Sequence, residues 1–197
     1  SDSTPMHIGS LPGYLRGIHE SIKIEDWQPG DCVIHNHPYK GASHSPDIAI
    51  VMPVFSNGDL VGFSANTAHH VDIGAATPGL IIDVPDVWAE GMLMDGVKLF
   101  HEGVRNEDLW KYIRDNTRVP DLVMGDLEAQ IASAELGVRR FEELLEKYGK
   151  GTVIQATKQL MDYTERRMRA EIAKIPDGEY FAEGFLDDDG RNREITL

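Results

Sequence analysis

Two apolar, strand-like runs joined by Asn57-Gly58 place the strongest constraint on how this chain can fold. The runs are residues 47–56 (DIAIVMPVFS) and residues 59–68 (DLVGFSANTA). Asn-Gly is the strongest two-residue signal for a tight hairpin, because the favoured turn needs positive φ at both central positions. The segment therefore predicts two antiparallel strands. Pro53 cannot donate a ladder hydrogen bond, so it marks a place where a bulge would shift the register.

The register of this hairpin predicts which side chains meet at its open end. A two-residue turn pairs the strands symmetrically about Asn57-Gly58, so Asp47 faces Ala68 and the residue before Asp47 faces His69. His69 then lies beside Asp47 and within a couple of residues of His44. Three potential ligands are thus predicted to meet at the mouth of one hairpin.

His44, Asp47 and His69 offer two imidazoles and one carboxylate. This set suits a borderline divalent metal ion with open positions, namely Zn²⁺, with Mn²⁺ or Fe²⁺ as alternatives. Strand side chains alternate between faces, but the Ser45-Pro46 kink lets His44 and Asp47 turn to one side. Such a metal would supply a nucleophilic hydroxide or polarise a carbonyl or phosphoryl oxygen. Residues at this spacing also cap turns or lie in solvent, and spacing alone does not distinguish these cases.

Further polar residues lie next to the three potential ligands in the sequence. His70 and Asp72 are candidates for catalytic proton transfer, and His35 and His37 are candidates for supporting contacts. Cys32 belongs to the apolar run CVI, which favours a buried, inert thiol over a nucleophile.

The segments before and after the hairpin are less regular. A short helical pattern precedes the Pro29-Gly30 turn, and residues 32–34 read as a short strand. Residues 72–105 contain many Gly, Pro and Asp residues and few periodic runs. We therefore expect them to form long loops over the site.

Helical periodicity dominates from Asn106 onward. Asn106 is typical of an N-cap, and acidic residues follow it in the first turn. Apolar residues then recur at three- and four-residue spacing from Pro120 to a stop at Gly149. A second apolar stripe follows and ends before Pro176. Two long helices with so short a connection predict an antiparallel helical hairpin.

Together these elements predict an α+β fold, in which a mixed β region with the metal-site hairpin packs against the long antiparallel helical hairpin. We expect residues 1–105 to form the metal-site β and loop region and residues 106–178 the helical hairpin region. Residues 179–197 would start a further β segment. The chain opens without Met and stops in the strand-like run REITL, so we expect a fragment of a longer subunit.

Composition argues against several classes of protein. The 33 acidic and 19 basic residues give a net charge of −14, which disfavours binding to a nucleic-acid backbone. No apolar run reaches the ~18–20 residues that a membrane span needs. The single cysteine allows no internal disulfide and suits a cytoplasmic protein. The sequence contains neither a Walker loop nor a GxGxxG motif, so no nucleotide site is predicted in this chain.

The sequence around the candidate site and three further segments resemble one known family. Around the candidate site, the sequence is GDCVIHNHPYKGASHSPDI, followed later by ANTAHHVDIGAATPG. The three further segments are STPMHIGSLP, GDLEAQIAS and YTERRMRAEIAKIPDGEYFAEGFLDDDG. As an ordered series, they resemble the hydantoinase B/oxoprolinase family. That family includes N-methylhydantoinase B-type subunits, a domain of 5-oxoprolinase, and the large subunits of acetone and acetophenone carboxylases.

The resemblance implies a role for the site. It assigns a divalent metal to His44, Asp47 and His69. Family enzymes work with an A-type partner subunit that uses ATP to phosphorylate an amide or enol oxygen, so ATP would be bound by that partner and not by this chain. The remainder of its own subunit would be a second partner. The implied reaction is hydrolysis of a small cyclic amide, such as a hydantoin or oxoproline, by metal-activated water.

Two alternatives remain open. The chain could belong to an ATP-dependent ketone carboxylase, or it could be a non-catalytic piece that serves subunit assembly. The usual family text NDPY or NDPW is replaced here by Asn36-His37-Pro38-Tyr39, so no role of that aspartate is carried over. Ser43 and Ser45-Pro46 resemble the hydantoinase branch more than the HQMD-like text of acetone carboxylases. We expect the fragment to be inactive alone.

Overall fold

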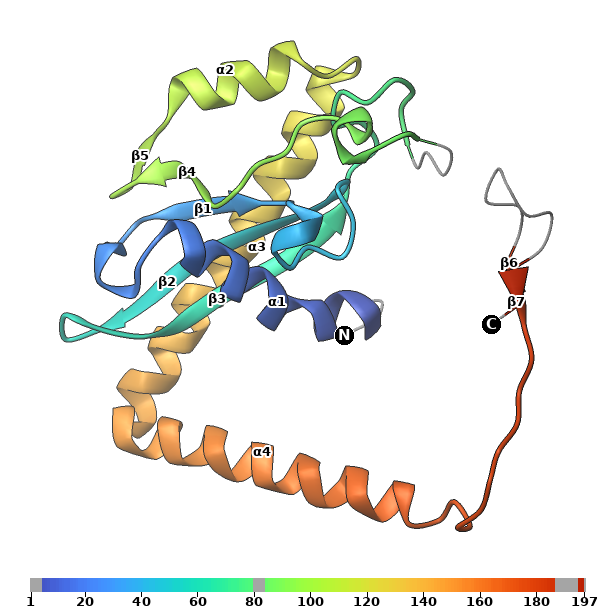
Figure 1. Cartoon of the computed structure of the whole chain (residues 1–197). Coiled ribbons are helices and arrows are strands. Elements are labelled where there is room, and N and C mark those ends of the chain that lie inside the picture. Colours follow the sequence, from blue (N-terminus) through green and yellow to red (C-terminus); the bar gives the residue numbers. More distant parts are fainter. Residues whose placement is uncertain (1–4, 80–83, 187–194, 197) are drawn as a thin grey trace. The chain divides into compact units, whose positions relative to one another are not determined.

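The computed structural model describes residues 5–79, 84–186 and 195–196 of the chain. The chain divides into two compact units, residues 1–150 and residues 151–197. The first unit contains the predicted hairpin and all the candidate site residues. Figure 1 shows its sheet with the elements labelled.

In the described residues, the first unit is built around a five-stranded sheet. Its strand order is β3 (Asp59–His69), β2 (Asp47–Ser56), β1 (Cys32–His35), β4 (Val97–His101) and β5 (Val104–Arg105). Each pairing between neighbours in this order is antiparallel. The predicted α+β class is therefore confirmed, and the β region that the sequence left as mixed is an antiparallel sheet.

The strands β4 and β5 correct the expectation of long loops throughout residues 72–105. They form a second hairpin around Glu102 and Gly103, both of which have positive φ, at 52° and 82°. These strands are only five and two residues long. Such short strands show too little alternation to stand out among Gly and Asp residues.

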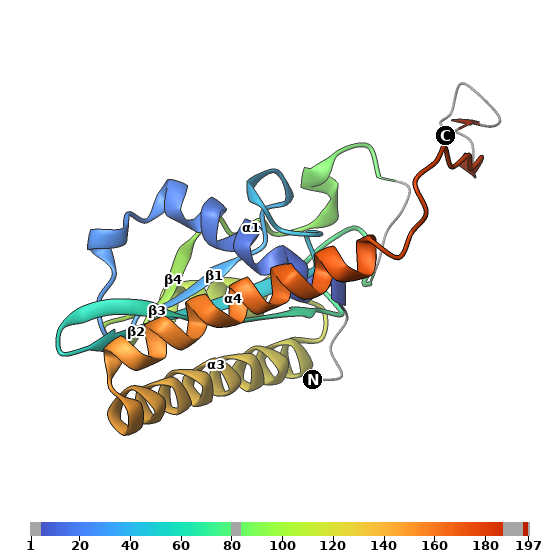
Figure 2. The same cartoon turned by 90° about the horizontal axis from the view of Figure 1, so that it is seen from below.

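Helices cover both faces of this sheet (Figures 1 and 2). α1 (Pro5–Ser21) lies on one face, while α2 (Glu107–Asp115) and α3 (Pro120–Tyr148) lie on the other. Because strand side chains alternate, the central strands β1 and β2 each contribute to two cores. The α1 core contains Ile18, Ile22, Trp27, Val33 and Val51. The α3 core includes Cys32, Ile34, Ile48, Ile50, Leu99, Leu127 and Ile131.

The β2–β3 hairpin contains one bulge that the sequence could only suggest. Phe55 pairs with Leu60, as a two-residue turn predicts, but Val54 pairs with Gly62. Val61 is therefore the extra residue on β3. The bulge lies one residue from Pro53, the residue that predicted a register shift. The sequence therefore predicted the shift, and the structure shows where it occurs.

This bulge decides which face of the sheet His69 joins. From the bulge to the open end every pair shifts by one residue, so Asp47 pairs with His69 and not with Ala68. Residues directly opposite in an antiparallel pair share a face, and a slip of one residue exchanges the faces. The symmetric register was wrong here; the bulged register places His69 on the same face as Asp47.

α1 is longer than the short helix predicted, and it lies against the loop that leads into β2. A Cβ atom on Gly13 would lie 2.8 Å from the Gly41 carbonyl oxygen, and one on Gly41 would lie 2.1 Å from the Gly13 carbonyl oxygen. Gly41 also has a φ of 95°, which favours glycine. These two glycines allow the close approach of α1 to this loop.

From Asn106 onward, the helical elements follow the predicted boundaries closely. The Asn106 side chain caps α2 by accepting the Leu109 N–H at 3.2 Å, and α3 ends at Gly149. α4 (Lys150–Ile172) starts at the last residue of the first unit, and the rest of it belongs to the second unit, with β6 (Phe185–Leu186) and β7 (Ile195–Thr196). The antiparallel pairing of the two long helices stays a prediction, because they belong to different compact units. The predicted region boundaries likewise remain predictions.

Short 3₁₀ turns complete the first unit: η1 (Ile24–Asp26), η2 (Pro38–Lys40) and η3 (Val87–Glu90). Among the helices in the described ranges, none combines the length and apolar character that a membrane crossing requires.

Candidate metal centre

A tight turn places His44 beside the start of β2. The Asp47 N–H donates to the His44 carbonyl oxygen at 3.0 Å, which closes a turn around Ser45-Pro46. This turn brings the two side chains to one side, as the proline kink predicted. His69 reaches the same place from the end of β3, because the bulge has set its register.

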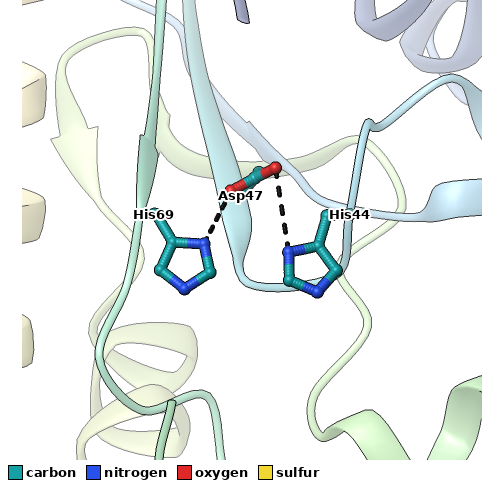
Figure 3. A group of neighbouring side chains, drawn as sticks. All are labelled: His44, Asp47 and His69. Carbon is teal, nitrogen blue, oxygen red and sulfur yellow. Dashed lines mark hydrogen bonds and ion pairs between the residues drawn. The ribbon is translucent and has the colours of Figure 1, made fainter. Parts of the chain in front are cut away.

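The three predicted ligands form one cluster, in which both imidazole rings turn toward the Asp47 carboxylate (Figure 3). His69 Nδ1 lies 2.9 Å from Asp47 Oδ1, and His44 Nδ1 lies 3.8 Å from Asp47 Oδ2. The two rings stack with centroids 5.4 Å apart and an interplanar angle of 18°. One potential ligand atom from each residue lies within 4.8 Å of the other two.

The chemistry of this cluster fits a divalent metal ion. Two imidazole nitrogens and one carboxylate oxygen make a three-residue donor set that leaves coordination positions free for water or substrate. The Asp47 side chain is only 2% exposed, so its charge needs compensating partners. The His69 side chain is 42% exposed, which leaves a path from solvent to the cluster.

Asp47 is also held by residues outside the cluster. Ser43 Oγ donates to Asp47 Oδ2 at 2.8 Å. The buried Tyr14 hydroxyl of α1 donates to the Asp47 backbone carbonyl at 2.9 Å, and it accepts the Ser43 N–H at 3.1 Å. Contacts of this kind orient the carboxylate toward an ion.

Asn36 fixes the His44–Asp47 turn from the other side. Its Nδ2 donates to the carbonyl oxygens of Ser45 at 2.7 Å and Met92 at 2.9 Å. Its Oδ1 accepts the Met94 N–H at 2.6 Å. The fully buried Asn36 therefore ties the turn to the loop before β4, a structural role that the sequence did not reveal.

One more histidine lies near the cluster and was missed by sequence reasoning. His7 of α1 places Nε2 at 3.4 Å from Asp47 Oδ2. His7 and Tyr14 are seven residues apart, which is two helical turns, so both lie on the same face of α1. The seven-residue spacing could have indicated from the sequence that His7 lies near Asp47. It could be used only if the helix was known to begin before His7, and the predicted helix was too short.

His70 points away from this cluster although it follows His69 directly. Alternation sends it to the α3 face, where it is buried and its Nε2 lies 2.6 Å from Gln130 Oε1. Burial lowers the pKa of His70 below its ordinary value, against the opposing effect of the Gln130 contact. Gln130 is a polar residue inside the apolar stripe of α3. A polar residue at such a position was the sequence signal that it has a buried polar partner.

The whole chain matches one known protein family. The family model described as hydantoinase B/oxoprolinase matches residues 1–197. The chain belongs to the hydantoinase B/oxoprolinase family.

Relatives within this family are similar along the chain. The chain is 49% identical over 206 residues to a putative B-type subunit of a D-/L-hydantoinase from Pseudomonas sp. (strain NS671), and the match covers 100% of this chain and 35% of that protein. It is 34% identical over 187 residues to the beta-type subunit of a caprolactamase from Pseudomonas jessenii, and the match covers 94% of this chain and 32% of that protein. The chain thus spans about a third of the length of these relatives.

Solved structures support the same assignment. The crystal structure of ATP-dependent caprolactamase from Pseudomonas jessenii matches with a TM-score of 0.82 and 33% identity, covering 93% of this chain and 32% of that one. The nucleotide-free structure of acetone carboxylase matches with a TM-score of 0.64 and 21% identity, covering 73% of this chain and 19% of that one. The second likeness shows a shared fold alone.

In this hydantoinase B/oxoprolinase chain, Asp72 lies apart from the three clustered residues. Its Oδ1 accepts the Gly74 N–H at 2.9 Å and Arg118 Nη1 at 3.0 Å, and its Oδ2 accepts the Arg118 N–H at 2.5 Å. The Arg118 guanidinium also donates to the Ala75 and Ala76 carbonyl oxygens. Both oxygens of Asp72 are therefore used to anchor the loop that follows His70.

The two remaining histidine candidates also lie outside the cluster. His35 is buried, and its Nδ1 accepts the Gly96 N–H at 3.1 Å while its Nε2 lies 3.0 Å from the Lys40 carbonyl oxygen. His37 stands where the usual family text has aspartate. Its buried Nδ1 has no hydrogen-bond partner within the described ranges.

Proposed function

We propose that this chain is the metal-bearing part of a B-type subunit of an ATP-dependent cyclic-amide hydrolase. The observation that carries the proposal is the convergence of His44, Asp47 and His69 on one partly open site. The family membership and the similarity to proteins named as a hydantoinase subunit and a caprolactamase subunit support the substrate class. An ATP-using assembly works where ATP is available, so we place it in the cytoplasm.

In this proposal, His44, Asp47 and His69 hold the ion, and Zn²⁺ fits them best, with Mn²⁺ or Fe²⁺ as alternatives. The bound ion would lower the pKa of water and polarise the oxygen of an activated amide. Ser43 holds the Asp47 carboxylate through its hydrogen bond to Oδ2, and Tyr14 holds the Asp47 backbone carbonyl. The exposed side of His69 is where the substrate approaches.

The two residues selected from the sequence for proton transfer lie apart from the cluster. His70 is buried against Gln130 on the α3 face, and both oxygens of Asp72 accept hydrogen bonds that hold the loop after His70. We therefore give neither residue the proton transfer at the cluster. The A-type partner subunit uses ATP to phosphorylate the amide oxygen, and the remainder of this subunit completes the pocket.

Metal analysis tests the site directly. Purified His44→Ala and His69→Ala variants are expected to lose most of the bound divalent metal, because each removes one of three protein ligands. His101→Ala is the matched control, since His101 is an exposed histidine of β4 outside the cluster. Unchanged metal content in both cluster variants would remove the metal site from the proposal.

Activity of the whole complex separates hydrolysis from carboxylation. The complete B-type subunit with its A-type partner and ATP is expected to open cyclic amides and to leave ketones unchanged. Ring opening is measured with a hydantoin, an oxoproline and a lactam. Carboxylation is measured with acetone and labelled bicarbonate. Incorporation of label into a ketone, with no amide opened, would assign the carboxylase function instead.

A further inference from the structure

β3 lies at an edge of the five-stranded sheet (Figure 1). Its eleven residues pair with β2 on one side, and no strand pairs with its other side within the described ranges. The unpaired side of an edge strand presents a row of backbone N–H and C=O groups that can pair with another segment. The strand at the opposite edge, β5, is only two residues long and presents almost no such row.

β3 lacks the features that protect exposed edges in natural sheets. Protected edges carry Pro or charged side chains, Lys above all, or are interrupted by bulges. The Val61 bulge lies close to the turn. The eight residues that follow it, 62–69 (GFSANTAH), include no Pro, Lys, Arg, Asp or Glu. This stretch is therefore open to pairing with a further strand.

The pairing with β2 determines which backbone groups of β3 point to the free side. The His70 N–H donates to the Pro46 carbonyl oxygen at 2.9 Å, so these two residues form a hydrogen-bonded pair. Hydrogen-bonded and non-hydrogen-bonded pairs alternate along an antiparallel ladder. Thr67 and His69 therefore direct their backbone N–H and C=O groups away from β2.

A depression of about 480 Å³ lies along this free side. Five consecutive residues, 66–70, line it from the strand, and Asp126, Ala129, Gln130 and Ser133 line it from α3. Consecutive side chains of a strand point to opposite faces, so only the edge of the strand can present all five residues to one space. The depression is therefore a groove between the free edge of β3 and α3, and we call it the edge groove.

The α3 wall of the edge groove has room for side chains and carries a negative charge. Ala129 and Ser133 are small side chains four residues apart on this wall, which places them on the same side of the helix. The Asp126 carboxylate lies one helical turn before Ala129. A strand that turns a Lys or Arg side chain toward α3 would meet an opposite charge there.

The length of the related proteins indicates where such a strand comes from. This chain covers 35% of the hydantoinase relative and 32% of the caprolactamase relative. Most of each relative therefore lies outside the matched region. A segment of the same polypeptide reaches the groove at a high effective concentration, which favours it over a separate partner.

We propose that an extended segment from the remainder of the same subunit adds a strand to the sheet at the free edge of β3. Its backbone pairs with Thr67 and His69, and one of its Lys or Arg side chains faces Asp126. The proposal rests on the proposed function in taking this chain as part of a larger B-type subunit. It goes further, because the added strand runs beside His69 and so borders the candidate metal centre.

Residue-resolved hydrogen exchange of the metal-free complete subunit tests the pairing. The Thr67 and His69 amides are expected to exchange as slowly as those of Ala68 and His70, which face β2. In the 197-residue chain, Thr67 and His69 should exchange fast while Ala68 and His70 stay protected. Fast exchange at Thr67 and His69 in the complete subunit would overturn the proposal, whether or not the shorter chain folds.

A proline substitution tests the same hydrogen bonds by removing a donor. Thr67→Pro deletes an N–H that β2 does not use, whereas the matched control Thr67→Val keeps the N–H and the β-branched shape. In the complete subunit, Thr67→Pro is expected to speed exchange at His69 by about tenfold, the equivalent of one lost hydrogen bond. Thr67→Val should leave it unchanged, and a slow His70 amide reports an intact ladder. Equal exchange at His69 in both variants, with the ladder intact, would contradict the added strand.

A second copy of the chain would protect the same edge in a different way. Protection of Thr67 and His69 would then appear in the 197-residue chain, would rise with protein concentration and would accompany the mass of a dimer. That result would assign the edge groove to a second copy and overturn the proposal.

Failure of the proposed function has a separate signature. The exchange measurements need neither metal nor ATP, so loss of the metal site in His44→Ala leaves the protection of Thr67 and His69 unchanged. Fast exchange at the edge, in a subunit that binds metal and opens cyclic amides, would remove the added strand alone.

Discussion

Asp47 shows how much a single buried carboxylate can organise. Its two oxygens lie near His69, His44 and Ser43, and its backbone carbonyl accepts the Tyr14 hydroxyl. A carboxylate that is 2% exposed must be compensated by such partners. The Ser43 contact is the one whose removal perturbs the carboxylate without deleting a potential ligand.

Ser43→Ala is expected to weaken divalent metal binding about 10- to 100-fold, the usual effect of losing a hydrogen bond to a ligand. The measurement is a competition titration against a chromophoric chelator. Ser56→Ala, at the far end of the same hairpin, serves as the control and should bind metal as the wild type does. Equal affinity in both variants would show that Ser43 does not orient the carboxylate.

His35 gives a pH-dependent contribution to stability away from the cluster. Burial lowers its pKa below the ordinary value, with smaller opposing effects from the Lys40 carbonyl and Asp95. The folded state therefore keeps His35 neutral while the unfolded state binds a proton. Its contribution is complete above the unfolded pKa of about 6.5 and is lost as pH falls below it.

His35→Gln should therefore flatten the pH dependence of stability. The free energy of unfolding in urea, measured at about pH 7.5 and about pH 5.5, is expected to fall less in the variant than in the wild type. The variant will also be less stable at the higher pH, since a buried residue has changed. A wild-type decrease that the variant reproduces in full would assign the titration to other histidines.

At the scale of elements, the site depends on how closely α1 approaches the loop before β2. A Cβ atom on Gly17 would lie 1.7 Å from the Lys40 carbonyl oxygen of η2. Backbone cannot yield as the tip of a side chain can, so α1 would have to move. Because α1 carries Tyr14 and His7, such a movement would also disturb Asp47.

Gly17→Ala is expected to destabilise the chain by about 1–3 kcal/mol, the usual cost of overpacking. Gly9→Ala in the same helix is the matched control: nothing lies within 4 Å of its added Cβ. It should be neutral or stabilising by up to about 1 kcal/mol through helix propensity. Urea unfolding of both variants checks this, and equal effects would contradict the close approach.

At the scale of the whole molecule, the cluster joins parts of the first unit that are distant in sequence. α1, the turn before β2 and the end of β3 all meet at Asp47 (Figure 3 for the last two). An ion bound there would hold the folded arrangement of these segments and bind the unfolded chain weakly. Metal binding and stability of the first unit are therefore linked.

Zn²⁺ at about a hundredfold excess over its dissociation constant should raise the free energy of unfolding by about 2.7 kcal/mol. Urea unfolding followed by the fluorescence of Trp27 and Trp110, both in the first unit, reports this change. His44→Ala should lose the increase. The same stabilisation in that variant would place the ion elsewhere.

Local sequence information was sufficient for the elements whose signals are strong and short-range. The Asn57-Gly58 turn, the Asn106 cap and the Gly149 stop all lie where the residues predicted. It was insufficient for β4 and β5, which are short and are stabilised by pairing with β1 and with each other. Such pairing depends on residues far away in the sequence.

The sequence by itself determined the hairpin, the long helices and the choice of His44, Asp47 and His69 as candidate ligands, because turn chemistry and periodicity act between near neighbours. Only the tertiary structure decided the register that puts His69 on the face of Asp47, through the Val61 bulge. The tertiary structure also decided which side chains lie next to the site on each face of the sheet. Tyr14 and His7 contact Asp47 on one face, and Gln130 contacts His70 on the other. These choices depend on which helix packs on which face of the sheet, and that follows from burying the apolar surface of the whole unit at once.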